Sequence, residues 1–165
     1  MSSAQDTFIS TTYHTERLGP VAALATLRKF QRCDVQRVIC ERGASIKQKW
    51  AKHGESSGLP LTVGGWDSWP NFGWGTLAKG ADALLLTSLF TQEMLARGFL
   101  ANTVVAVSFA HTEEVLALYH EAAEEVFKQI AAWVAECGGA AEPGAVSQCV
   151  KFLEGPVRHG GFHRV

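Results

Sequence analysis

The chain has 165 residues, of which 47% are hydrophobic, and its formal net charge is −1. These values are typical of a single globular domain, and the balanced charge excludes an extended basic surface that would bind nucleic acid. No apolar run is long enough to cross a membrane, and residues 1–12 are polar, without the apolar core of a signal peptide. The four cysteines form no C-x-x-C pair, which predicts free thiols in a reducing cytoplasm.

Two helices are predicted in the first third of the chain. Pro20 suits the first turn of a helix, and an apolar face follows it at Val21, Leu24, Ala25, Leu27 and Phe30. Asp34 suits the N-cap of a second helix, and Gly54 suits its end. The side of the second helix that we expect to be buried carries Val35, Val38, Ile39, Ile46 and Trp50.

The segment 58–75 has a different pattern. Apolar residues alternate with others over 59–63, as in a strand, and the pair Gly64-Gly65 predicts a turn. Aromatic residues then recur among glycine, proline and aspartate, at Trp66, Trp69, Phe72 and Trp74. Such a cluster either caps a hydrophobic core or lines a ligand-binding site, and we favour the core.

A third helix and a further strand are predicted next. Asp82 suits the start of the helix, and Arg97 followed by Gly98 marks its end, because a cation is favourable near the negative end of the helix dipole. The β-branched and aromatic residues of 99–110 then predict a strand.

The last long helix is predicted to begin after Thr112, a good N-cap, and to end at Gly138-Gly139. Its apolar stripe, at spacings of three and four, is Val115, Leu118, Tyr119, Ala122, Val126, Ile130 and Trp133. A linker at 142–145 and a short helix near 146–153 precede a tail rich in glycine and histidine. The order of helices and strands predicts an α+β (α/β) fold.

Two patterns with possible metal chemistry are weak. The sequence H-E-A-A-E, from His120 to Glu124, begins like the helix of zinc proteases, but Glu124 stands where the second histidine is required. We therefore expect a solvated helix face there. His159 and His163 are expected to belong to a flexible tail, so no metal site is assigned. The sequence also lacks a phosphate-binding glycine loop and a G-x-S-x-G nucleophile motif.

Three stretches carry a resemblance to a known family. Residues 4–27 read A-Q-D-T-F-I-S-T-T-Y-H-T-E-R-L-G-P-V-A-A-L-A-T-L. Residues 89–112 contain L-F-T-Q-E-M-L-A-R-G-F-L and then F-A-H-T, and the tail reads L-E-G-P-V-R-H-G-G-F-H-R-V. In this order they resemble the C-terminal part of class III aminotransferases, which depend on pyridoxal 5'-phosphate (PLP), in the branch similar to glutamate-1-semialdehyde aminomutase.

The resemblance implies a fold-type I enzyme that transfers an amino group through PLP. It assigns 1–32 to the end of the large domain and a connector helix. It assigns 33–140 to the C-terminal small domain, a small antiparallel sheet packed on helices, and 141–165 to a tail with a short helix. The family dimerises, so we expect a homo-oligomer or association with the large domain, and no nucleic-acid or membrane partner.

The family holds PLP through a Schiff-base lysine just before the first matching stretch. No lysine here matches that motif, neither Lys29, Lys47, Lys49 and Lys52 nor Lys79, Lys128 and Lys151. We therefore assign no catalytic residue and expect the chain alone to be inactive and not to bind PLP.

One cofactor contact is implied, at Thr12, whose hydroxyl and N–H would reach the PLP phosphate of a neighbouring subunit. The alternative is that Thr12 only occupies a strand or loop in a hydroxyl-rich run. A second hypothesis for the whole chain is a non-catalytic interaction module that associates with an intact homologue.

Overall fold

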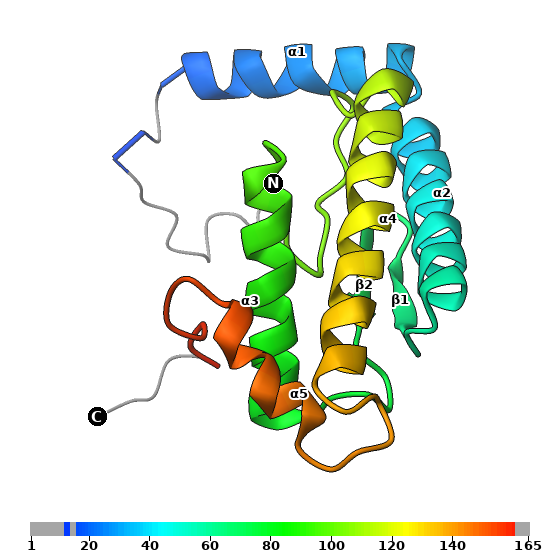
Figure 1. Cartoon of the computed structure of the whole chain (residues 1–165). Helices are drawn as coiled ribbons and strands as arrows, with labels where there is room; N and C mark the ends of the chain where they lie inside the picture. The colour runs from blue at the N-terminus through cyan, green and yellow to red at the C-terminus, as the bar shows by residue number, and fades with distance from the viewer. Residues whose placement is uncertain (1–11, 14–15, 161–165) are drawn as a thin grey trace. The chain divides into compact units, whose positions relative to one another are not determined.

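The computed structural model describes residues 12–13 and 16–160 (Figure 1). The chain divides into two compact units, with the boundary between Gln36 and Arg37. The described elements are α1 (Leu18–Arg32), α2 (Val35–Ser57), β1 (Thr62–Trp66), β2 (Trp69–Gly73), α3 (Gly80–Ala96), α4 (Glu113–Glu136), α5 (Ala145–Gln148) and a short 3-10 helix, η2 (Cys149–Phe152). This is an α+β fold, as predicted. No helix in the described part of the chain is long and apolar enough to cross a membrane.

Helix α1 is the regular element of the first unit. Pro20 lies in its first turn, as predicted, where a missing N–H costs no hydrogen bond. None of the helix residues is buried. Leu24 and Leu27 are 54% and 58% exposed, and Val21 and Phe30 on the same stripe are exposed as well. No described residue of the first unit covers the apolar face of α1.

Helix α2 continues one turn beyond the predicted end. Gly54 lies inside the helix and is buried, and a Cβ there would meet the Leu61 side chain at 2.8 Å. The helix ends instead at Gly58, whose φ of 70° is the left-handed conformation that glycine adopts easily. The Leu59 N–H closes this end by donating to the Gly54 carbonyl at 2.9 Å. Gly54 is thus required for close packing against Leu61, and Gly58 ends the helix.

Strands β1 and β2 form an antiparallel hairpin, paired from Thr62 opposite Gly73 to Trp66 opposite Trp69. The chain reverses at residues 67–68, so the turn predicted at Gly64-Gly65 is wrong. Both glycines lie within β1. A Cβ on Gly65 would approach the Trp69 carbonyl oxygen to 2.4 Å, so this glycine allows a close approach between the two strands.

The strand predicted at 99–110 is only partly formed. The segment 103–107 runs antiparallel to β2, and Val105 N–H donates to the Pro70 carbonyl at 3.0 Å. The reciprocal hydrogen bond to the Val105 carbonyl is impossible because Pro70 has no N–H. Thr103 likewise turns its N–H to the Asn102 side chain, at 2.7 Å. The two segments therefore form one bridge, between Asn71 and Val104, and a further bond from the Val107 N–H to the Ser68 carbonyl at 3.2 Å, without a continuous ladder.

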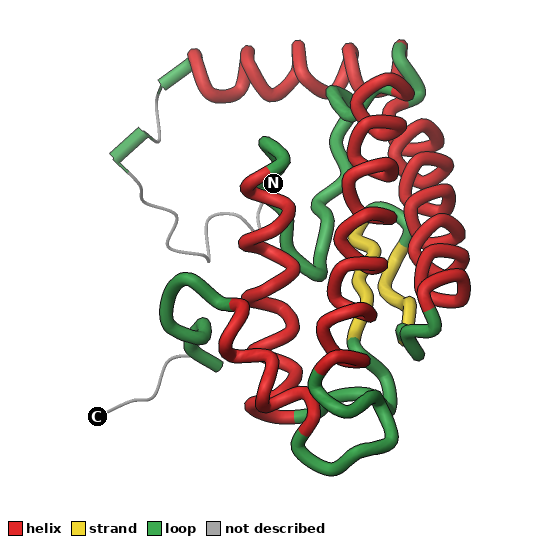
Figure 2. Tube along the Cα trace, in the orientation of Figure 1, coloured by secondary structure: helices red, strands yellow, loops and turns green. Residues whose placement is uncertain are grey.

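The core is centred on Phe72 of β2. Its ring lies edge-on to Trp50 of α2, with centroids 5.0 Å apart, and edge-on to Phe90 of α3 and Phe127 of α4 at 5.2 and 5.3 Å. Aromatic rings favour this geometry. Rings from three helices, α2, α3 and α4, therefore meet at Phe72. Figure 2 shows the course of these helices and of the two strands.

The aromatic segment predicted to cap a core is divided between the two faces of the hairpin. Trp74 is buried with Phe72, and its indole N–H donates to the Thr87 hydroxyl at 3.0 Å. Trp66 and Trp69 are exposed. The expected core role is thus confirmed for the two inward residues only.

Helix α4 begins and ends as predicted. The Thr112 side chain accepts from the Val115 N–H, and Gly138 follows the last turn with a φ of 113°. The buried stripe, however, is rotated relative to the prediction, because Val115 and Leu118 are exposed. The residues that face the core are Leu116, Tyr119, His120, Ala122, Ala123, Val126, Phe127, Ile130 and Val134.

The segment after α4 packs back onto the second unit. Phe152 stacks on Trp133 of α4, with ring centroids 4.7 Å apart. Ser147 donates to the Asp82 carboxylate at 2.6 Å. Asp82 lies in the first turn of α3, and Lys79 takes the N-cap position. The predicted short helix is present as α5 and η2. All four cysteines are free thiols, as expected.

Candidate functional site

Thr12, the residue assigned to a cofactor phosphate, lies in an exposed turn before α1. The carbonyl of its neighbour Tyr13 accepts from the Glu16 N–H at 3.0 Å. An exposed hydroxyl and amide are suitable donors for a phosphate oxygen of another molecule. Within the first matching stretch, residues 4–11 and 14–15 lie outside the described residues.

The seven lysines are all described, and none is enclosed. Six are exposed, and the seventh, Lys47, pairs with Asp67 at 2.5 Å. A Schiff-base lysine requires a desolvated setting or a neighbouring cation that makes its amine nucleophilic. The lysines of this chain therefore do not fit a covalent PLP site.

A first cavity of about 290 Å³ lies between the segment 99–106, α2 and the beginning of α4. Its lining is mostly apolar, with Tyr119 and His111 as polar groups. Burial raises the pKa of Tyr119 well above its ordinary value, and its hydroxyl accepts from the Trp50 indole N–H at 3.0 Å. Tyr119 is therefore held protonated.

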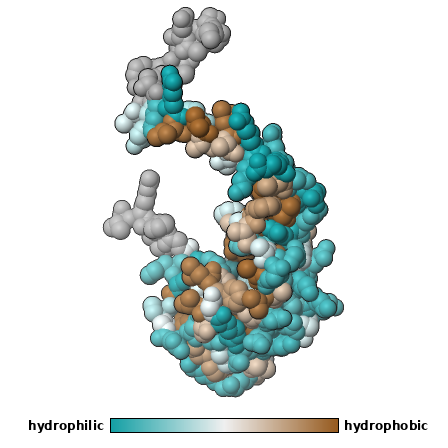
Figure 3. All heavy atoms as spheres, turned by 90° about the horizontal axis from the view of Figure 1, so that it is seen from above, coloured by the Kyte–Doolittle hydropathy of each residue, from teal (hydrophilic) through white to brown (hydrophobic). Residues whose placement is uncertain are grey.

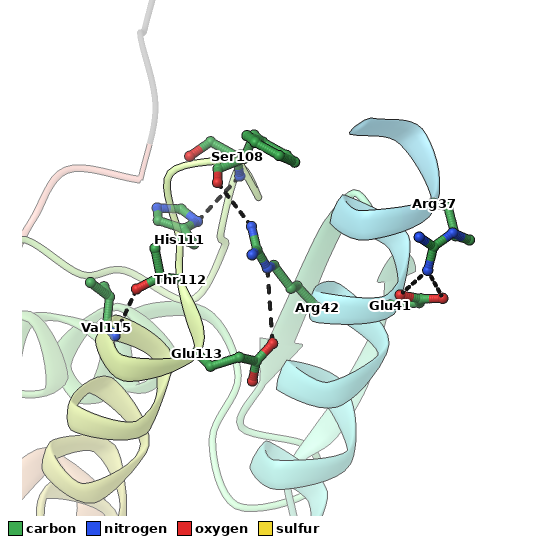
Figure 4. Close-up of polar contacts among 9 residues, drawn as sticks. Arg37, Glu41, Arg42, Ser108, His111, Thr112, Glu113 and Val115 are labelled. Carbon is green, nitrogen blue, oxygen red and sulfur yellow. Dashed lines mark hydrogen bonds and ion pairs between the residues drawn. The ribbon is translucent and has the colours of Figure 1, made fainter. Parts of the chain in front are cut away.

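Polar contacts hold the loop before α4 (Figure 4), and His111 of this loop lines the first cavity. Arg42 of α2 donates to the Phe109 carbonyl at 2.9 Å and lies 4.0 Å from the Glu113 carboxylate. His111 Nδ1 accepts from the Ser108 N–H at 3.2 Å, so its neutral tautomer carries the proton on Nε2. These contacts position the loop before α4.

A second cavity, of about 330 Å³, lies between α2 and α4 and contains His53 and His120. The two rings are 6.1 Å apart between centroids, and they are 5% and 8% exposed. The prediction that His120 faces water is therefore wrong. His120 lies between Leu116 and Phe127 on the buried stripe of α4. Their helical spacing is the sequence signal that indicates a buried His120. No signal in the sequence indicated His53.

Both imidazoles are held neutral at physiological pH. Burial lowers the pKa of His120 to about 4, and repulsion from His53, once that ring is protonated, and from Lys49 lowers it as well. Burial also lowers the pKa of His53, and Glu124 partly offsets this effect. Lys49, Lys52 and Lys128 lower it further.

These shifts predict a stability that depends on pH. The pKa of His120 rises to its ordinary value near 6.5 on unfolding, so its contribution is complete above pH 6.5 and is lost as the pH falls towards 4. Between pH 7.5 and pH 5, we expect the free energy of unfolding to fall by about 2 kcal/mol. Urea unfolding at each pH measures this slope. His120→Leu should remove most of it and His159→Gln should keep it, whereas equal slopes in all three proteins would contradict the assignment.

Comparison of the chain with protein-family models, with curated proteins and with solved structures finds no match. Within residues 12–13 and 16–160, no group of three or more His, Cys, Asp or Glu side chains is arranged to hold a metal ion. His163 lies outside the described residues.

Proposed function

We propose that this chain is the C-terminal portion of a PLP-dependent aminotransferase or aminomutase of class III. The observation that supports the proposal best is the second unit. It combines a small antiparallel hairpin, extended by the segment 103–107, with three helices packed on one face. This agrees with the small domain that the three matching stretches imply, and α1 agrees with the connector helix.

In this proposal, the chain supplies binding groups and closure of the active site, while the amino transfer depends on a lysine carried elsewhere. Thr12 donates its hydroxyl and N–H to the PLP phosphate of a neighbouring subunit. PLP supplies the electron sink that makes amino transfer possible when it is bound. A single phosphate contact is too weak to offset the cost of association, so residues 1–165 by themselves are not expected to bind PLP.

The apolar stripe of α1 supports a partner for this helix. Val21, Leu24, Leu27 and Phe30 are all exposed, and a stripe of this width is normally covered in a folded protein. Further hydrophobic side chains are open to solvent on the face shown in Figure 3. In the proposed enzyme, the large domain and the neighbouring subunit cover these surfaces.

The uncovered stripe predicts self-association of the purified chain. Leu24→Glu with Leu27→Glu should reduce the oligomeric mass in light scattering and the binding of a hydrophobic dye, because it places charge on the stripe. Ala22→Glu with Thr26→Glu adds the same charge to the opposite side of α1 and is the control. A wild-type chain that is monomeric and does not bind the dye would contradict this prediction.

The second candidate, a non-catalytic module that associates with an intact homologue, is favoured by the same exposed stripe. The coding sequence upstream of Met1 separates the two. The first proposal expects a continuous reading frame that encodes a strand containing a lysine. An in-frame stop codon there would support the interaction module instead.

A further inference from the structure

The second cavity contains a pair of histidines to which the proposed aminotransferase function gives no role. His53 comes from the last turns of α2, and His120 comes from the second turn of α4. Their rings are 6.1 Å apart, tilted by 47°, and each residue is more than nine-tenths buried. Two elements far apart in sequence thus bring two imidazoles together.

The nitrogen atoms of this pair lack protein partners. His53 Nε2 and both ring nitrogens of His120 are buried and make no hydrogen bond. A buried polar atom without a partner costs free energy, so such atoms are rare in proteins and call for an explanation. A neutral imidazole has one nitrogen with a free lone pair, and that lone pair is the group that binds metal ions.

Charged groups of both signs surround the pair. Three carboxylates, Glu113, Glu121 and Glu124, line the cavity together with the ammonium group of Lys49. Glu113 lies 4.0 Å from Arg42, and Glu124 pairs with Lys128 at 2.6 Å. The charges therefore largely offset one another, and the unpartnered imidazole nitrogens are the groups available to a ligand.

Glu124 is placed to orient His53. Its Oε2 atom lies 3.6 Å from His53 Nδ1, on the side of the ring away from the unpartnered Nε2. This distance is just beyond a hydrogen bond, but the negative charge favours the proton on Nδ1 and so leaves the Nε2 lone pair free as a ligand.

We propose that His53 and His120 form a binding site for one divalent transition-metal ion, such as Zn²⁺. His53 binds through Nε2 and His120 through one of its free ring nitrogens, while water molecules complete the coordination. Metal–nitrogen bonds of about 2.0–2.1 Å place two imidazole centroids roughly 5–6 Å apart on one ion. The rings therefore have to approach each other by less than about 1 Å to share an ion. The ion links α2 to α4.

Calorimetric titration of the full chain with ZnCl₂ at pH 7.5 tests the site. We expect one ion per chain, and His53→Gln or His120→Gln should weaken binding on the order of 100-fold, because each removes a ligand. Glu124→Gln should weaken it roughly 10-fold, as loss of an orienting carboxylate does. The control is His159→Gln with His163→Gln, which removes the tail histidines and should leave the affinity unchanged.

A second measurement is independent of how the variants fold. In the wild-type protein, Zn²⁺ should shift the side-chain nitrogen resonances of two histidines in NMR spectra, and the shifts should disappear as the pH falls and the rings protonate. The proposal is overturned if the tail variant loses binding, or if the shifted resonances belong to histidines other than His53 and His120. Absence of binding at millimolar Zn²⁺ would overturn it as well.

Discussion

Phe72→Ala is expected to lower the free energy of unfolding by about 4 kcal/mol. Phe72 is 4% exposed, and its ring contacts one aromatic ring from each of α2, α3 and α4, as well as Trp74 of its own segment. Removal of the ring leaves a cavity that these large, rigid neighbours cannot fill by small movements. Urea unfolding followed by circular dichroism measures the loss.

Trp66→Ala is the matched control for this prediction. It removes a larger aromatic ring from the same hairpin, but Trp66 is 82% exposed. The change in unfolding free energy should stay within about 0.5 kcal/mol. A comparable loss in both variants would show that Phe72 is not the centre of the core.

Gly43→Ala is expected to have the second-largest effect, a loss of about 3 kcal/mol. A Cβ at Gly43 would lie 1.5 Å from the backbone carbonyl oxygen of Asp67, at the tip of the hairpin. Backbone cannot move aside as a flexible side chain can, so the hairpin and α2 must separate. The Lys47–Asp67 ion pair joins the same two elements and would be strained with them.

Gly19→Ala in α1 is the matched control, because nothing lies within 4 Å of a Cβ built there. Alanine favours helix more than glycine does, by about 1 kcal/mol, so this variant should keep or raise the helical content. Thermal unfolding and circular dichroism of both variants measure the contrast. Equal stability of the Gly43→Ala protein and the wild type would contradict the contact between α2 and the hairpin.

The parts of the fold that the sequence predicts are those with local signals. Thr112 caps α4 and Gly98 ends α3 because caps and left-handed stops act on residues next to them in the chain. The roles of Gly43, Gly54 and Gly65 could not be predicted from such local signals. Each is required by a backbone or side chain that approaches from another element, and the sequence alone does not show that approach.

The same reason explains why one candidate site could be predicted from the sequence and the other could not. Thr12 is found through a resemblance between continuous stretches of sequence. The pair His53 and His120 is separated by two strands and a helix, and it becomes visible only when α2 and α4 pack together. The buried stripe of α4 is rotated relative to the predicted one. His120 therefore faces the core, on the same side of the helix as Leu116 and Phe127.

Borohydride trapping of the native protein tests the central proposal most directly. Borohydride reduces a PLP–lysine Schiff base to a stable phosphopyridoxyl-lysine, which survives isolation with an antibody against this chain and is located by peptide mass spectrometry. We predict one such lysine in the isolated assembly, in polypeptide that precedes residues 1–165 or in an associated large domain, and none at the seven lysines of this chain. An adduct at one of those seven lysines, or an isolated assembly with no phosphopyridoxyl-lysine, would contradict the proposal.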